Sequence, residues 1–316
     1  MNPTARKHHY LPQAYLAAFT DTESKDGQFY VLDTGSGTCF RTSPKNVAAE
    51  RDFNRVDLEG KSPDILEQAL SPFEDRAVQA IRNVIRTETF PSDEDYHFII
   101  NLLGLMAVRN PQSRKSINWS RQEKIHLMAN LLVSDKKIFD HHLNKSQEAG
   151  YVAETNVSFE QMKQFIEERR YRIEFAPKGD HRVEFHNFDQ LLPILGQRIW
   201  SLLVAPSPGP GFICSDHPVA LTWKNPDSRV PIGYGLKNTE VFFPLGPRTG
   251  FYGVYEDPLP TVIKIKPAQV AMMNWRVAQS AERHVFSATD TFFVWYKGEV
   301  REVDCGSNLR VQRTPG

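Results

Sequence analysis

The sequence predicts an α+β fold with an N-terminal β-hairpin, a helical middle and a C-terminal, mainly antiparallel sheet with a late helix. Three observations lead to this fold class. Two aromatic and β-branched runs flank a glycine-containing turn near the start of the chain. Apolar residues then recur at spacings of three and four through the middle. Short strand-like runs between turns fill the last third, and this layout is typical of α+β proteins.

With 316 residues, the chain could hold one large domain or two modest ones. No obvious flexible linker, solenoid repeat or low-complexity segment divides it. We therefore expect a single domain over 1–316 with three sub-regions. These are an N-terminal segment and hairpin over 1–60, a helical region over 61–199 and a sheet-rich region over 200–316.

The first sub-region predicts one short helix and a hairpin. Pro12 suits the first turn of a helix over 11–19, where apolar residues follow helical spacing. The two hairpin strands are expected over 29–32 and 39–41, because the residues between them have turn chemistry. A further extended piece is expected over 53–56.

The middle predicts four helices. Ser62 and Pro63 mark the start of the first, which Pro72 either restarts or kinks. Ser92 begins the second, whose first turn is acidic and which should stop before Pro111. The other two are expected over 117–133 and 159–170, with a loop or frayed helix over 137–156.

The last third predicts six short strands and one helix. The helix is expected over 268–281, and Pro267 marks its start. The strands are aromatic or β-branched runs expected over 200–204, 211–214, 219–223, 241–244, 251–255 and 291–297.

Composition and charge narrow the class of protein. Lys+Arg and Asp+Glu both number 38, which excludes a globally basic nucleic-acid binder or a polyanionic tail but leaves a local patch open. A polar start predicts no secretory signal, and the longest apolar stretch, 98–108, is well short of the ~20 residues of a membrane helix. Three widely spaced cysteines without a CxxC pair predict reduced thiols, so a cytoplasmic location is expected.

The most unusual motif contains His8 and His9, followed by Tyr-Leu-Pro and Gln13. A helix that begins at Pro12 leaves its first backbone N–H groups unpaired, and such an end attracts an anion. The two imidazoles could add hydrogen-bond donors there, or they could ligate a metal. Alternatively, one histidine caps the helix or bonds a buried carbonyl while the other is exposed.

A second motif lies where an apolar strand ends in Ser215, Asp216, His217 and Pro218. A strand holds such side chains rigidly, and Asp216 could orient an imidazole, act as a general base or ligate a metal. A Ser–Asp–His triad is only weakly indicated, because no GxSxG-like elbow surrounds Ser215. The alternative is an Asx-type turn in which Ser215 and Asp216 bond local backbone N–H groups.

Further candidates lie on the predicted helices. Arg109 suits the negative end of a helix dipole, or it points inward and pairs with Glu74, Asp216 or a bound anion. Glu67 and Glu74 share one helical face if the helix is not kinked, and such pairs can bind metal but are mostly solvated. Asn274 could bond either a site or a loop. No P-loop, Rossmann glycine pattern, HExxH or zinc-ribbon spacing occurs.

Positive charges concentrate in the helical middle, with an aromatic residue among them, and such a local patch could bind nucleic acid. A solvated helix face is the alternative. The members of the patch are Arg82, Arg86, Arg109, Arg114, Lys115, Trp119 and Arg121.

These motifs resemble the pattern of a bacterial family catalogued as a domain of unknown function. Residues 7–19 are similar to its opening, His-His-x-x-Pro-x-x-x-Leu-x-x-Phe, and the Ser-Asp-x-Pro strand end is similar to a later motif. The resemblance extends from residue 7 to about 290, so it implies one architecture for the whole chain but no specific activity. It also implies that six residues converge in the fold, namely His8, His9, Gln13, Arg109, Asp216 and Asn274.

Two functions stay open. The first is a hydrolase or nuclease acting on a phosphorylated or nucleic-acid substrate. The alternative is a non-catalytic binding or regulatory protein in which the same residues are structural. The candidate catalytic residues are His8, His9, Arg109 and Asp216, and the candidate substrate-binding residues are Gln13, Glu74, Ser215 and Asn274. No cofactor is identified, although a divalent metal is one alternative. The expected partner is a small-molecule or nucleic-acid substrate, with no membrane and no obligate protein partner.

Overall fold

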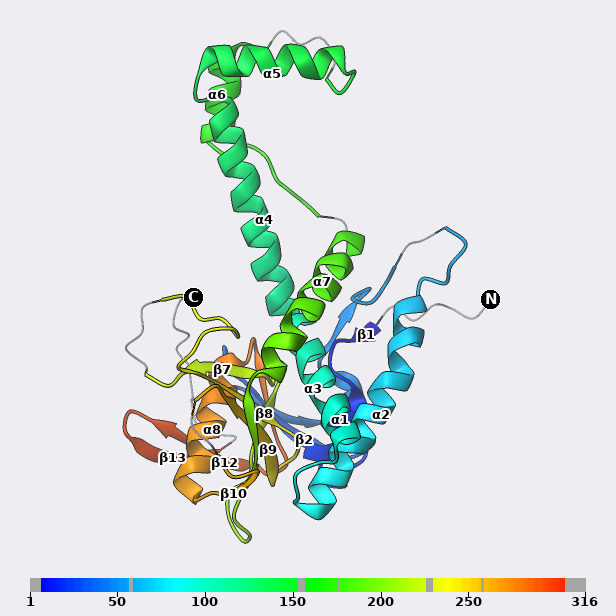
Figure 1. Ribbon diagram of the computed structural model, residues 1–316, viewed down its shortest axis with the longest axis vertical. Helices are drawn as coiled ribbons and strands as arrows, with labels where there is room; N and C mark the ends of the chain where they lie inside the picture. Colours follow the sequence, from blue (N-terminus) through cyan, green and yellow to red (C-terminus); the bar gives the residue numbers. More distant parts are fainter. Residues whose placement is uncertain are drawn as a thin grey trace. The chain divides into compact units, whose positions relative to one another are not determined.

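The computed structural model describes residues 7–56, 59–152, 157–175, 177–225, 230–256 and 259–304. The chain forms two compact units. One, the main unit, combines Met1–Gln112 with His181–Gly316, and the other, the helical unit, is Ser113–Asp180. Figure 1 shows the elements of both units with the labels used below.

The fold is α+β, as the sequence predicts, and the N-terminal hairpin is confirmed. Strands β2 (Phe29–Asp33) and β3 (Cys39–Thr42) pair antiparallel. The expected strand at 53–56 is wrong, because the strand there is β4 (Ala49–Arg51), which pairs with β1 (Lys7–His9). The chain turns directly after β4, where Asp52 has a positive φ of 58° and ends the extended backbone.

Helix α1 (Gln13–Leu16) and a 3-10 turn (Ala17–Phe19) follow β1. Helix α2 (Ile65–Thr87) begins after Asp64 rather than at Ser62, and it continues through Pro72 without a break. Helix α3 (Asp93–Val108) has Ser92 as its N-cap, as predicted, since the Ser92 hydroxyl accepts the Asp95 N–H.

Five strands form the largest sheet, in the order β10-β5-β9-β8-β7, and all neighbours are antiparallel except β10 with β5. Their bounds are β5 (Ile199–Val204), β7 (Ala220–Trp223), β8 (Thr239–Pro244), β9 (Thr249–Val254) and β10 (Val262–Lys264). A four-stranded sheet, β3-β2-β11-β6, joins the hairpin to β6 (Cys214–Ser215) and β11 (His284–Ser287). Strands β12 (Thr291–Tyr296) and β13 (Glu299–Asp304) pair with each other.

In the main unit, the five-stranded and four-stranded sheets lie between helices α1, α2 and α3 on one side and helix α8 (Pro267–Ser280) on the other (Figure 1). Figure 1 also shows β12 and β13 on the side of α8. Side chains alternate accordingly, because successive residues of a strand point to opposite faces. On β8, Phe243 packs in the core shared with α2 and α3, whereas Phe242 packs in the core shared with α8.

The remaining helices are α4 (Pro111–Leu132), α5 (Lys136–Glu148), α6 (Phe159–Glu167) and α7 (Pro177–Gly196). The predicted helices over 117–133 and 159–170 correspond to α4 and α6, which begin or end a few residues away from the predicted ends. A regular helix, α5, occupies much of the stretch expected to be a loop or frayed helix, because Asp135 caps it by accepting the N–H groups of Lys137 and Ile138. Helix α7 is not predicted at all.

The thiols differ from the expectation of a fully reduced set. Cys39 is disulfide-bonded, so the prediction of a reduced thiol is wrong for this residue. Cys214 is a free, fully buried thiol whose pKa burial raises to about 12, and it is therefore unreactive at neutral pH. Cys305 lies outside the described residues. Among the described helices, none has both the length and the apolar composition needed to span a membrane.

The pairing of Gly253 with Trp200 leads to a prediction about stability. Trp200 lies opposite Gly253 in the β5–β9 register, and its indole N–H donates to the Leu195 carbonyl at 2.9 Å. A Cβ at residue 253 would lie only 2.8 Å from the Trp200 ring. Gly253→Ala is therefore expected to lower the free energy of unfolding by about 1–3 kcal/mol. Chemical denaturation measures this. The control is Gly196→Ala, whose Cβ meets nothing within 4 Å, and an equal loss in both variants would contradict the prediction.

Candidate functional site

The N-terminal histidines lie on a strand that is firmly attached to the main unit. Strand β1 pairs with β4, with His8 opposite Glu50. The following helix, α1, is anchored by Tyr15, which is fully buried and whose hydroxyl donates to the Pro244 carbonyl at 2.7 Å. Tyr15 also stacks on Phe243, with ring centroids 5.4 Å apart. Because release of this segment would expose a buried aromatic side chain, the histidines have a fixed place in the fold.

His8 is buried, and both of its ring nitrogens face polar groups. Its Nδ1 accepts the backbone N–H of Asn54 at 2.9 Å, and its Nε2 lies 3.4 Å from Oδ1 of Asp64. A nitrogen that accepts a hydrogen bond carries no proton, so the proton of the neutral ring is on Nε2, towards Asp64. His8 therefore connects the turn after β4 to the start of α2.

His9 is partly exposed and connects a different pair of groups. Its Nε2 lies 3.3 Å from the Lys45 carbonyl, which can only accept, so Nε2 carries the proton. Its Nδ1 then accepts the side-chain amide of Gln13 at 3.3 Å. Burial lowers the pKa of His9, so the ring is neutral at pH 7.

Asn54 is the centre of the cluster around these histidines. Besides its backbone contact with His8, its side-chain amide donates to Oε2 of Glu67 at 2.5 Å and to the His9 carbonyl at 3.4 Å. Its side-chain carbonyl accepts Nη2 of Arg109 at 2.5 Å. Since Asn54 is only 2% exposed, these bonds replace those that water would otherwise supply.

Arg109 and Glu184 form a buried ion pair beside Asn54. Arg109 follows the last residue of helix α3, and its Nε lies 3.9 Å from Oε2 of Glu184 on α7. The Glu184 side chain is fully buried. Glu184 also lies 3.4 Å from Nδ1 of His181, whose Nε2 is 3.2 Å from the Arg55 carbonyl. The inward orientation of Arg109 matches one of the two predicted alternatives, but the paired carboxylate is one that the sequence does not suggest.

Glu67 and Glu74 lie on one face of α2, because the helix is not interrupted at Pro72. Burial raises the pKa of Glu74 to about 7, with the charge of Arg109 acting against the shift and that of Glu67 adding to it. Glu74 as a residue is nevertheless partly exposed. A carboxyl group that is half ionised near neutral pH can both take up and release a proton there.

These residues form what we call the Asn54 cluster. Its buried members are His8, Asn54, Arg109, His181 and Glu184, and its partly exposed members are His9, Gln13, Asp64, Glu67 and Glu74. Its named members include four carboxyl groups, those of Asp64, Glu67, Glu74 and Glu184, and the guanidinium of Arg109. Within the described ranges, no three or more His, Cys, Asp or Glu side chains are grouped so that they could hold a metal ion.

Ser215 and Asp216 use their side chains on backbone N–H groups. The Ser215 hydroxyl accepts the His217 N–H at 3.2 Å, which matches the local-turn alternative. The Asp216 carboxylate accepts the N–H groups of Glu282, Arg283 and His284 at 2.7–2.9 Å. Burial raises the pKa of Asp216 to about 6, although these three donors act in the opposite direction.

Asn274 likewise fastens backbone segments. It is fully buried on α8, where its Oδ1 accepts the Ile213 N–H at 3.0 Å. Its Nδ2 donates to the carbonyls of Gly211 and Phe293, each at 3.0 Å. Both protons and one lone pair of this amide are thus engaged by the loop before β6 and by β12.

The predicted site residues therefore fall into two groups. His8, His9, Gln13, Glu74 and Arg109 join the Asn54 cluster, whereas Ser215, Asp216 and Asn274 bond the backbone around β6 and α8. The carboxylate nearest to Nε2 of His8 in these contacts belongs to Asp64, not to Asp216. Tyr10, which follows His9, has its pKa raised by burial, and the charge of Asp216 adds to the shift.

Sequence reasoning missed Asn54, Asp64, His181 and Glu184. Asn54 follows β4 in a turn with no recognisable motif, and Asp64 reads as part of a helix start. His181 and Glu184 lie three residues apart on α7, a spacing that places two side chains on one helical face. That spacing was the one available signal, but it required a helix that the sequence pattern does not indicate.

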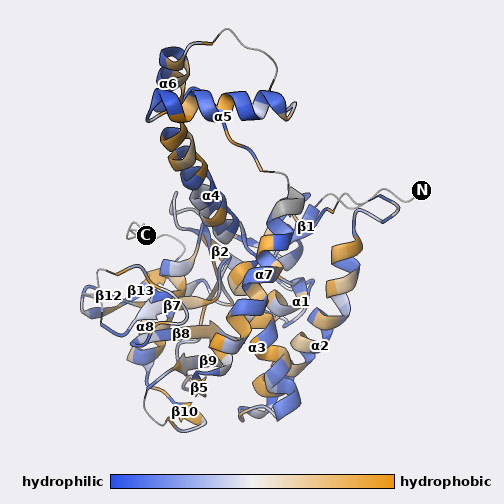
Figure 2. Ribbon diagram, turned by 45° about the horizontal axis from the view of Figure 1, so that its top comes forward, coloured by the Kyte–Doolittle hydropathy of each residue, from blue (hydrophilic) through white to orange (hydrophobic). Residues whose placement is uncertain are grey.

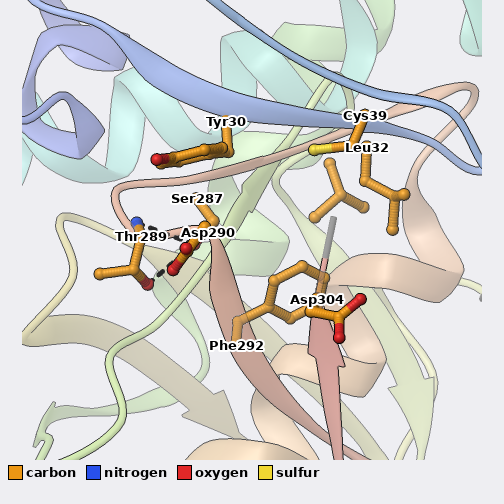
Figure 3. A pocket seen from close by; sticks show the side chains of 9 residues that line it. Tyr30, Leu32, Cys39, Ser287, Thr289, Asp290, Phe292 and Asp304 are labelled. Carbon is orange, nitrogen blue, oxygen red and sulfur yellow. Dashed lines mark hydrogen bonds between the residues drawn. The ribbon is translucent and has the colours of Figure 1, made fainter. Parts of the chain in front are cut away.

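A separate pocket lies between the four-stranded sheet and the β12–β13 pair. Its cavity volume is about 10 Å³, and its lining includes Tyr30, Cys39, Phe292, Asp290 and Asp304. Figure 3 shows Tyr30 and Cys39 on one side and Phe292 and Asp304 on the other. Because ligand sites usually enclose about 300 Å³ or more, and no predicted site residue lines it, we do not place the site there.

Comparison with known proteins identifies the family to which this chain belongs. Searches of curated proteins and of solved structures find no match for this chain. A family model described as "Protein of unknown function (DUF4238)" matches residues 7–291, which include every member of the Asn54 cluster. The match covers both units and most of the sequence. The chain therefore belongs to the DUF4238 family of proteins of unknown function.

Proposed function

We propose that this protein is a hydrolase, and that the carboxyl group of Glu74 is its general base. The observation that carries the proposal is the Asn54 cluster, in which Arg109 and Glu67 are fixed by Asn54 and act electrostatically on Glu74, a partly exposed residue whose pKa burial raises to about 7. A base with a pKa near the working pH is the most effective, because it is ionised often enough and still binds a proton well. Glu74 would accept a proton from the water that attacks the substrate.

The other members of the cluster have supporting roles in this proposal. Arg109 is engaged by Asn54 and Glu184, so it positions Asn54 and keeps the pKa of Glu74 from rising further. His9 and Gln13 are partly exposed and lie next to each other, which makes them the candidates for substrate contact. His8 positions Asn54 through its Nδ1.

The proposed substrate is phosphorylated or a nucleic acid, as the residue types suggest. The carboxyl groups of Glu67 and Glu74, when ionised, would repel a bare phosphate anion. A phosphate that carries Mg²⁺ is a better match, since Mg²⁺ in proteins is held by one or two carboxylates together with substrate phosphates and water. A bacterial, cytoplasmic origin is part of the proposal, although the disulfide at Cys39 is more typical of an oxidising compartment.

Glu74→Gln tests the catalytic assignment. We expect hydrolysis of phosphomonoester, phosphodiester and oligonucleotide probes with Mg²⁺ to fall by about 10²–10⁴-fold, because the amide cannot accept the proton. In the wild-type protein, kcat/KM should rise with pH through about 7, where Glu74 ionises. Glu302→Gln, which removes an exposed carboxylate from β13, is the control. Full activity in Glu74→Gln, or no hydrolysis of any probe by the wild-type protein, would overturn the proposal.

The same substitution has an opposite effect on stability. Since the pKa of Glu74 is higher in the folded protein than in the unfolded chain, its ionisation increasingly destabilises the fold as pH rises from about 4.5 to about 7. Glu74→Gln removes this cost, so the variant should be more stable than the wild type at pH 8 by about 1–3 kcal/mol and equal to it at pH 4. Urea denaturation at both pH values measures the difference. A loss of stability at pH 8 would show that the carboxyl group is structural.

A non-catalytic function is the second candidate, and the bonds of the Ser-Asp-x-Pro motif favour it. Asp216 accepts three backbone N–H groups, as expected of a structural residue. Asp216→Ala leaves these buried donors unpaired and should lower the free energy of unfolding by about 3 kcal/mol or more. Asp290→Ala, at an exposed aspartate, should change it by less than about 0.5 kcal/mol. If Asp216→Ala were as stable as the wild type but inactive, Asp216 would belong to the active centre.

A further inference from the structure

Glu184 is a buried carboxylate that the proposed reaction does not yet use. It lies on α7, where hydrophilic and hydrophobic residues are mixed along the helix (Figure 2), and its side chain is fully buried. A carboxylate that is removed from water is costly unless cations or hydrogen-bond donors surround it. Its Oε2 lies 3.9 Å from Nε of Arg109 and 3.4 Å from Nδ1 of His181. Glu184 is therefore stabilised by the Asn54 cluster, and its charge acts on Arg109.

The contacts of Glu184 complete a closed ring of contacts in the cluster. His181 lies with its Nε2 3.2 Å from the Arg55 carbonyl, and Arg55 follows Asn54 in the chain. The side-chain carbonyl of Asn54 in turn accepts Nη2 of Arg109 at 2.5 Å. The contacts thus run from Asn54 through Arg109 and the two α7 side chains to the backbone beside Asn54. Since Asn54 binds the guanidinium at Nη2 while Glu184 faces its Nε, the orientation of Arg109 is set from two sides.

The same contacts lie where the chain leaves and re-enters the main unit. Arg109 comes shortly before Gln112, the last residue ahead of the helical unit, and His181 is the first residue after it. The ion pair between Arg109 and Glu184 therefore joins the chain before and after the helical unit, which offsets the entropic cost of closing a long loop. This would be a purely structural role for Glu184. It would change the stability of the fold but not the ionisation of another carboxyl group in the cluster.

The ionisation of Glu74 distinguishes a structural role of Glu184 from a role in the reaction. Four charged side chains act on the pKa of Glu74, and the effect of Arg109 is the largest of them. Arg109 and Lys25 favour the ionised form, whereas Glu67 and Asp75 favour the neutral form. A carboxylate held against one side of a guanidinium offsets part of its positive charge, since opposite charges have opposing fields. Glu184 can therefore change the ionisation of Glu74 through Arg109 without contacting Glu74.

We propose that Glu184 is a positioning residue of the hydrolase site, which fixes the guanidinium of Arg109 towards Asn54 and limits the charge that it presents to Glu74. The proposal rests on the proposed function, in which Glu74 is the general base. Glu184 does not contact the reacting atoms, so its influence on the reaction passes through Arg109. With the charge of Arg109 partly offset, Glu74 remains able to take up a proton near neutral pH, because a stronger positive field would keep its carboxylate ionised and weakly basic.

Glu184→Gln tests the proposal, since the amide keeps the shape of the side chain and removes its charge. We expect the pH profile of kcat/KM to move to lower pH by about one unit, because Arg109 then favours ionised Glu74 more strongly. The carboxyl carbon of Glu74, followed by NMR, should titrate at a correspondingly lower pH than in the wild type, where its pKa is about 7. Glu240→Gln is the matched control, because Glu240 is also buried and is paired with Arg276 of α8. It should leave both titrations unchanged.

Glu184→Asp gives a second measurement, which carries the test alone if Glu184→Gln does not fold. Its carboxylate keeps the charge but lies farther from Arg109, so the titration of Glu74 should move in the same direction by less than about one unit. A titration of Glu74 that stays at the wild-type pH in the folded variants would overturn the proposal and would leave Glu184 with a structural role alone. If the wild-type protein hydrolyses no probe, the proposed function fails and the role of Glu184 in catalysis fails with it, even where the titration moves.

Discussion

The hydrogen bonds of Asn54 hold together the cluster in which most of the candidate site residues lie. This one side chain contacts α2 through Glu67 and the end of α3 through Arg109, while its backbone N–H contacts β1 through His8. The bonds to His8 and Arg109 are buried, so losing either would leave a polar group unpaired in the interior, whereas the bond to Glu67 is partly buried. Segments from four regions of the sequence are thus oriented by a residue that has no reactive group. Its importance lies in geometry rather than in chemistry.

The environment of Glu74 shows how opposing influences set the acidity of one carboxyl group. Burial favours its neutral form, and the guanidinium of Arg109 favours the ionised form. Burial outweighs the guanidinium, so the pKa of Glu74 is raised, to about 7. Arg109 is also bonded to Asn54 and lies beside Glu184, so one guanidinium serves three side chains of the cluster.

Much of the fold could be predicted because its signals are local. The hairpin at 29–41, the Ser92 cap and the late helix follow from turn residues, an N-cap and a helix-starting proline. Helix α7 was missed because its apolar residues are interrupted by charged ones, among them the buried Glu184, which reads as a surface residue. Strand β11 was missed because its strand character comes from its neighbours β2 and β6 rather than from its composition.

The site was less predictable for a related reason. His8, His9 and Arg109 are unusual in the sequence, and they do lie in one cluster. Their partners Asn54 and Glu184 are ordinary residues, and only the tertiary fold makes them neighbours. Asp216 illustrates the opposite case, because a strand-end aspartate beside a histidine suggests chemistry, whereas its carboxylate bonds the backbone of 282–284.

The order of strands in the four-stranded sheet has a consequence for how the protein is made. Strand β2 lies between β3 and β11, so Asp33 is paired with His284, about 250 residues later in the chain. While the ribosome is still synthesising the second half, the hairpin has an open edge with unpaired backbone groups. The apolar side chains of α3 also await the strands β5, β8 and β9. Until β11 has left the ribosome, nascent chains therefore expose this edge and these apolar side chains to one another, and such exposure favours aggregation over folding.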